Sequence, residues 1–171
     1  MQIERLDPKP EFDMIYFLEM SGLNRIEQDM LDALESGWTD WLDRVQAFRI
    51  APEKAKKGEG YLLVFLPESV EQAVETAWET SPEHGESFHN LAVTLVMASA
   101  QNLLPDLLEA CAPLPKPSKA MQEAFEKIGV RWNPQIDKLD RQYALFTLTP
   151  YRGGCELCSQ SASCPNSTLA Q

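Results

Sequence analysis

The chain has 171 residues, which is enough for one domain to bury a substantial apolar core without help from metal ions or disulfides. Its 26 acidic and 15 basic residues give a formal charge of −11, which repels phosphate backbones and anionic lipid surfaces. This charge excludes nucleic acid and membranes from the expected partners. The first residues contain no apolar segment of the signal-peptide kind, and we expect a cytoplasmic protein.

The N-terminal part of the sequence predicts a strand followed by a long helix. The apolar run 14–20 ends at a Ser-Gly pair and indicates a buried strand. Apolar residues then recur at helical spacing over 24–45, and Asn24 and Glu27 have the spacing of a capping box. We expect this helix to belong to the core of the protein.

A hairpin and a second helix are predicted next. Residues 46–51 and 61–66 are apolar segments on either side of a polar stretch, which favours a β-hairpin with a long exposed loop. Pro67 then marks the first turn of an amphipathic helix whose apolar face includes Trp78. By the same reasoning Trp38 and Trp41 belong to the core, whereas Trp132 is expected to be an exposed contact residue. Strand, helix, strand, strand and helix therefore follow one another.

This order is the beginning of an α+β, ferredoxin-like sandwich built on a split βαβ unit. Such a fold needs a fourth strand, and residues 143–149 supply one, which we expect beside 14–20. A helical insertion at about 83–129 precedes it. The insertion contains a buried helix and two shorter ones, at 86–104, 105–110 and 118–128.

The chain is expected to form a single α+β domain over 1–150 and a cysteine-rich tail over 151–171. The tail consists mainly of Gly, Ser, Gln, Asn and Thr, and it has few large apolar side chains to bury. Metal binding or docking on the domain must therefore order the tail if it is ordered at all.

Three of the four cysteines form a C-x2-C-x5-C-P pattern at Cys155, Cys158 and Cys164. The spacing and the proline favour an iron–sulfur cluster, [4Fe–4S] in type. Zinc, a redox dithiol at Cys155 and Cys158, and a disordered tail with incidental cysteines are the alternatives. Cys111 is either a fourth ligand or a small apolar residue at a helix end.

The same spacing resembles the auxiliary-cluster domains of radical S-adenosylmethionine maturases and the C-terminal motif of the nitrogenase molybdenum-donor protein. A further cysteine of these motifs would fall near Thr168 in the first family and on Pro150 in the second. Since this chain lacks both, the resemblance implies only that the spacing is compatible with iron–sulfur ligation.

Catalytic signatures are missing from the sequence. His84 and His89 are the only histidines, and we expect them to be surface or capping residues. We therefore predict no catalytic residues, and expect an iron–sulfur or metal-binding accessory protein in electron transfer or metallocofactor assembly. Its partner is then a redox protein or metalloenzyme. The alternative is an acidic interaction module with a disordered or zinc-ordered tail.

Overall fold

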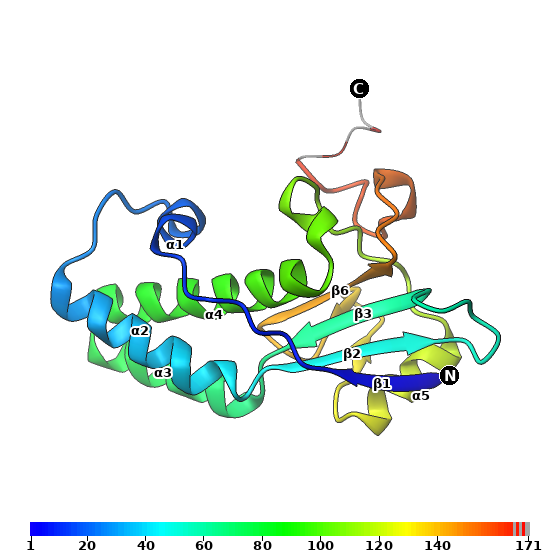
Figure 1. The fold of residues 1–171 in the computed structure, drawn as a ribbon, viewed down its shortest axis with the longest axis horizontal. Coiled ribbons are helices and arrows are strands. Elements are labelled where there is room, and N and C mark those ends of the chain that lie inside the picture. Colours follow the sequence, from blue (N-terminus) through cyan, green and yellow to red (C-terminus); the bar gives the residue numbers. More distant parts are fainter. Residues whose placement is uncertain (166, 168, 170–171) are drawn as a thin grey trace.

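The computed structural model describes residues 1–165, 167 and 169 of a mixed α/β protein. Its main sheet has the order β1-β2-β3-β6, and every neighbouring pair of strands is antiparallel (Figure 1). The four strands are Gln2–Leu6, Gln46–Ala51, Gly60–Phe65 and Ala144–Thr149. A second, two-stranded sheet is formed by β4 (Trp132–Asn133) and β5 (Lys138–Leu139).

The described part of the chain also contains five α-helices and two short 3-10 turns. The helices are α1 (Met14–Ser21), α2 (Gln28–Leu42), α3 (Glu68–Thr80), α4 (Pro82–Leu103) and α5 (Lys119–Lys127). The 3-10 turns are η1 (Pro105–Leu108) and η2 (Cys155–Leu157). Within the residues described, none of these helices is both long and apolar enough to cross a bilayer.

The prediction of a strand over 14–20 is wrong, because this segment forms α1. The Asp13 side chain accepts hydrogen bonds from the backbone N–H groups of Ile15 and Tyr16, so it caps the N-terminus of the helix. At the other end, Gly22 adopts a left-handed conformation with φ of 71°, and its N–H donates to the carbonyl oxygen of Leu18. Both ends of the segment therefore carry helix signals.

The expected pairing of 143–149 with 14–20 is also wrong. Strand β6 pairs instead with β3, in a register that places Phe146 opposite Leu63. The first strand is β1, which was not predicted from the sequence, and it pairs with β2 at one edge of the sheet. The antiparallel pairing of the 46–51 and 61–66 strands is confirmed. The ferredoxin-like arrangement is not confirmed, because a split βαβ unit requires parallel neighbours.

The other helices follow the predicted pattern with corrections at their ends. Helix α2 begins at Gln28 with Glu27 as its N-cap, and Glu27 makes no side-chain capping bond. Trp38 and Trp41 are buried, as expected, but Trp78 is 43% exposed and Trp132 only 8%. The long buried helix of the insertion is confirmed as α4, and α5 fits the predicted 118–128 helix.

Apolar side chains of the sheet alternate between two cores. On one face Leu62, Val64 and Leu145 pack with α4, which also contacts α1, α2 and α3. On the other face Leu63 and Phe146 pack with α5 and the small sheet. This alternation of side chains along each strand is what allows one sheet to support helices on both faces.

Candidate metal centre

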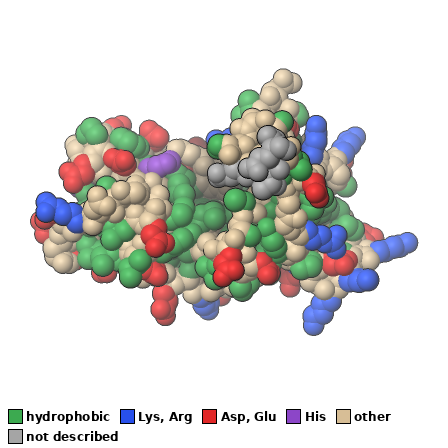
Figure 2. All heavy atoms as spheres, turned by 90° about the horizontal axis from the view of Figure 1, so that it is seen from above, with side chains coloured by type: hydrophobic (Ala, Val, Ile, Leu, Met, Phe, Trp, Pro, Cys, Tyr) green, Lys and Arg blue, Asp and Glu red, His purple; other side chains and the backbone are tan. Residues whose placement is uncertain are grey.

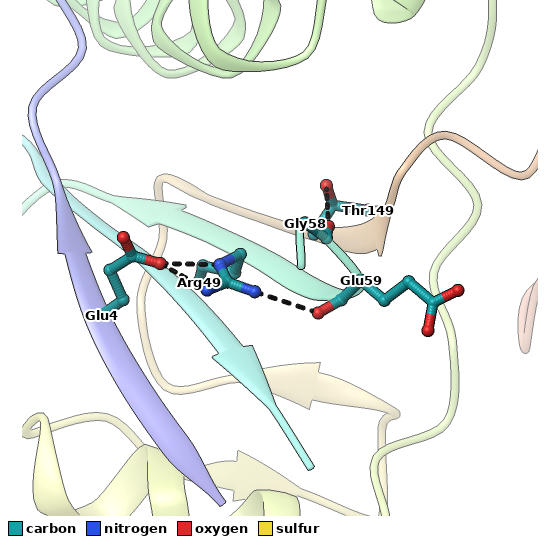
Figure 3. Close-up of polar contacts among 5 residues, drawn as sticks. All are labelled: Glu4, Arg49, Gly58, Glu59 and Thr149. Carbon is teal, nitrogen blue, oxygen red and sulfur yellow. Dashed lines mark hydrogen bonds and ion pairs between the residues drawn. The ribbon is translucent and has the colours of Figure 1, made fainter. Parts of the chain in front are cut away.

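The cysteine segment, residues 150–165, begins directly after β6, and the β2–β3 loop contacts the chain at this point. Figure 3 shows that Arg49 of β2 lies between Glu4 of β1 and this loop. Its Nε and Nη2 atoms are each 2.7 Å from Glu4 Oε2, and its Nη1 donates to the Glu59 carbonyl oxygen at 3.2 Å. Three sequence segments are therefore joined at one guanidinium group.

Two further contacts attach the start of the segment to that loop. The Thr149 hydroxyl donates to the Gly58 carbonyl oxygen at 3.3 Å (Figure 3), and Arg152 Nη2 lies 3.6 Å from Glu59 Oε1. The adjacent Gly60 has a φ of 150°, and a Cβ atom there would lie 2.6 Å from the Ile50 carbonyl oxygen. Only glycine fits at this position, so the loop that holds the segment is itself tightly constrained.

The cysteine segment folds as a series of turns. Gly154, with a φ of 135°, precedes η2, and the Cys158 N–H donates to the Cys155 carbonyl oxygen at 3.2 Å. Another turn follows, in which the Ser161 N–H donates to the Cys158 carbonyl oxygen, also at 3.2 Å. Turns of this kind satisfy backbone groups locally without an apolar core.

The connector, residues 109–118 between η1 and α5, lies beside the cysteine segment. The Ser159 N–H donates to the Leu114 carbonyl oxygen at 2.8 Å, and the Leu114 N–H donates to Cys158 Sγ at 3.4 Å. The Tyr151 hydroxyl donates to the Cys111 carbonyl oxygen at 3.4 Å. The structure therefore brings the segment that contains Cys111 next to the segment that contains Cys158.

The four thiols differ in exposure. Cys155 and Cys158 are partly buried, whereas Cys111 and Cys164 are exposed, and no disulfide joins any of these four described residues. Among residues 1–165, 167 and 169, no three His, Cys, Asp or Glu side chains are grouped so that they could hold a metal ion. Thr168, near which one related motif has a cysteine, lies outside the described residues. The metal ligands remain a prediction.

Neither histidine lies in the cysteine segment. The backbone N–H of His84 donates to the Ser81 hydroxyl oxygen at the start of α4, and its Nδ1 is 3.0 Å from the same oxygen. The capping residue of α4 is therefore Ser81, and His84 is the residue whose N–H group it caps. His89 Nδ1 is instead 3.0 Å from the hydroxyl oxygen of Tyr143, a residue next to β6 that the sequence analysis did not single out.

Tyr143 and Cys111 both line a cleft of about 450 Å³ between α4, β6 and the connector. Burial, and to a smaller extent the charges of Glu75 and Glu71, raise the pKa of the Tyr143 hydroxyl to about 12. This side chain is 3% exposed, so its hydroxyl stays protonated in the folded protein over a wide range of pH.

The raised pKa of Tyr143 predicts a loss of stability at alkaline pH. In the unfolded chain this hydroxyl has an ordinary pKa of about 10, so its stabilising contribution is complete below that pH and disappears as the pH rises towards about 12. We expect Tyr143→Phe to show a shallower fall in urea midpoint across this pH range than the wild type. Burial also raises the pKa of Tyr16, so Tyr16→Phe should change the slope in the same direction. An unchanged slope in Tyr143→Phe would contradict the assignment.

Leu114 itself carries no signal for this contact, but the two residues beside it do. Pro113 has no N–H group, and Pro115 favours an extended conformation for the residue before it. Leu114 is thus left to present both an N–H and a carbonyl oxygen to a neighbouring segment, as it does to residues 158 and 159.

In comparisons with known proteins, no family model, curated protein or solved structure matches this chain.

Proposed function

We propose that the cysteine segment binds an iron–sulfur cluster of the [4Fe–4S] type, with Cys155, Cys158 and Cys164 as ligands and Cys111 as the fourth. The protein then serves as an accessory in electron transfer or metallocofactor assembly, with a redox protein or metalloenzyme as its partner. Zinc bound to the same thiolates is the alternative cofactor. The observation that carries the proposal is the hydrogen bond from the Leu114 N–H to Cys158 Sγ.

This hydrogen bond supports ligation because it places a donor on a sulfur atom. Metal-bound sulfur is a thiolate, and backbone N–H groups stabilise its negative charge. Hydrogen bonds to sulfur are also among the features by which proteins adjust the reduction potential of a cluster. A donor that points at Cys158 Sγ from a segment 44 residues earlier in the chain suits this role.

The proximity of the Cys111 segment supports the fourth ligand. Contacts from Tyr151 and Ser159 hold residues 111–114 against the cysteine segment. The exposed Cys111 and Cys164 side chains are at the surface, where a cluster can reach them. The thiols of the described residues are not grouped around one point, so binding requires the segment to rearrange. Metal binding releases on the order of 10 kcal/mol in small domains, enough to order such a segment.

Metal analysis of protein purified without oxygen tests the proposal. We expect about four irons and four sulfides per chain, as in a [4Fe–4S] cluster, and a brown solution. About one zinc per chain and no sulfide would select the zinc alternative. A colourless protein that takes up neither metal after incubation with ferrous iron and sulfide, or with zinc, would rule out a metal-binding function for this segment.

A second candidate function is an acidic module that binds another protein. Its support is the distribution of charge, since residues 11–43 and 68–109 together carry 17 of the 26 acidic side chains and only one basic one, Arg25. A surface with one sign of charge attracts and orients partners of the opposite sign. In this function the cysteine segment needs no metal.

A further inference from the structure

Charge is divided between two parts of the molecule. Residues 68–109, which form α3, α4 and η1, carry eight acidic side chains and neither lysine nor arginine. Figure 2 shows Lys and Arg gathered at the end that carries the β2–β3 loop, whereas acidic side chains dominate the helical end. The helical part is therefore an anionic surface on a protein whose other end is basic.

The cleft described above opens beside this anionic part. Its walls are mainly apolar, although Gln142 and Cys111 also contribute. The apolar lining comes from α4, the connector and the start of β6, and consists of Val93, Val96, Met97, Ala112, Leu114, Tyr143, Ala144, Leu145 and Phe146. A cleft of about 450 Å³ lies within the range of about 300–1,000 Å³ that is typical of ligand sites.

Carboxylates of α3 lie at one end of the cleft. The Gln142 N–H donates to Glu71 Oε1 at 2.8 Å. After burial, the negative charges of Glu75 and Glu71 also contribute to the raised pKa of the Tyr143 hydroxyl. One basic side chain is close to them, because Arg141 Nη1 lies 4.0 Å from Glu71 Oε2. Arg141 can neutralise one of the two carboxylates, so this end of the cleft keeps a net negative charge.

Apolar surface extends beyond the cleft on elements that pack against α4. Leu108 of η1 is 67% exposed, and Met14 and Ile15 of α1 are 43% and 67% exposed. Both α1 and η1 contact α4. Large apolar side chains exposed on two elements that contact α4 add to the apolar surface around the cleft, and exposed apolar surface indicates protein contacts.

We propose that the cleft is the docking site for an amphipathic segment of a partner protein, in which apolar side chains enter the cleft and flanking Lys or Arg side chains face the carboxylates of α3. This inference rests on the second candidate function, that the acidic helices bind a protein, and it holds with or without a bound metal. Apolar anchors one helical turn apart are the usual means by which a helix binds in such a groove. Charge complementarity selects a basic segment over an acidic one.

Synthetic peptides test the proposal on the full-length protein. The probe is a fluorescein-labelled Leu/Lys peptide of about 15 residues, roughly four helical turns, with Leu on one face. One matched peptide has every Lys replaced by Glu, and another has the same composition with Leu scattered around the helix. By fluorescence anisotropy we expect the amphipathic basic peptide to bind at least about tenfold more tightly than either control, a difference of 1.4 kcal/mol.

Two pairs of protein variants locate the site. Met97→Ser removes an apolar wall of the cleft and is expected to weaken binding about tenfold, whereas Met30→Ser, at a half-buried methionine of α2 outside the cleft, changes it less than about twofold. Replacing Glu71 and Glu75 together by Gln is expected to weaken binding roughly threefold and to reduce its dependence on salt. The matched control replaces Glu123 and Glu126 of α5 together by Gln. It changes the net charge equally on the other face of the sheet and should have little effect.

Nuclear magnetic resonance of the wild-type protein keeps the test independent of any variant that fails to fold. Amide shifts on addition of the basic peptide should concentrate at residues 93–97, 111–114 and 142–146. Shifts spread over all acidic helices, or equal weakening by the cleft variants and their controls, would overturn the proposal and leave only non-specific attraction. Because the peptide is titrated into both metal-free and iron-treated protein, failure of peptide binding is distinguished from failure of metal binding.

Discussion

Replacing Phe125 by alanine is expected to lower the free energy of unfolding by about 3–5 kcal/mol. Phe125 of α5 is fully buried, and its ring meets that of Phe146 edge to face, with centroids 5.1 Å apart. The substitution removes the apolar contact and leaves a cavity on the face of the sheet that α5 covers. Because single domains have only about 5–15 kcal/mol of stability in total, this is a large loss.

Equilibrium unfolding in urea, followed by circular dichroism, measures this effect. Lys127→Ala in the same helix changes an exposed side chain and should alter the free energy of unfolding by less than about 0.5 kcal/mol. Phe125→Leu keeps most of the apolar volume and should cost less than about 1.5 kcal/mol. A loss below about 1 kcal/mol in Phe125→Ala would show that α5 is not part of a well-packed core.

Replacing Cys158 by serine is expected to remove most of the bound iron while the circular dichroism of the helices persists. A cluster needs its thiolates together, so the loss of one ligand releases or degrades it. The helices pack on the sheet through apolar side chains and do not depend on this sulfur atom. Iron and sulfide analysis of each variant is the measurement, and Ser161→Ala in the same segment is the matched control.

The other cysteine variants complete this test. Cys155→Ser and Cys164→Ser should lose iron as Cys158→Ser does, and full retention in all three would contradict the proposed ligands. Cys111→Ser distinguishes a three-cysteine site from a four-cysteine site, because comparable loss makes Cys111 the fourth ligand. Full retention in that variant would assign Cys111 to the lining of the cleft alone.

The periodicity of the sequence predicted the hairpin, α3, α4, α5 and β6, because these elements have regular apolar patterns with clear ends. It failed at 14–20, where six of the seven residues are apolar and fit a buried strand or a helix equally well. Only the ends decide between the two, and Asp13 and Gly22 both make helix-capping contacts. The strand was predicted from the apolar run alone, whereas the residues at its two ends indicate a helix.

The strand order could not be predicted from local patterns. Strand β1 is a short edge strand with polar residues at most positions, so its apolar signal is weak. Because 14–20 forms α1 and not a strand, it cannot pair with β6. The partner of β6 is decided by contacts between distant segments, such as Val64 with Leu145. Apolar periodicity specifies which face of a strand is buried but leaves its neighbours open.

The candidate site was predicted in part for a similar reason. The spacing of Cys155, Cys158 and Cys164 identifies a cysteine segment, since it depends on nearby residues alone. The contact of Cys158 with Leu114 joins segments 44 residues apart. The prolines on either side of Leu114 leave its backbone groups available, but they do not specify the partner segment. The cleft likewise combines side chains from α4, the connector and β6, so it exists only after the chain has folded.

Leu114 belongs to both of the proposed sites, because it lines the cleft while its N–H donates to Cys158 Sγ. A peptide that shifts this residue therefore changes the environment of a metal ligand, and a metal that fixes the ligand changes the shape of the cleft. Thermodynamic linkage makes the two effects equal: the factor by which metal alters peptide affinity is the factor by which peptide alters metal affinity. If both proposals hold, Leu114 couples the occupancy of the metal site to the affinity for the partner.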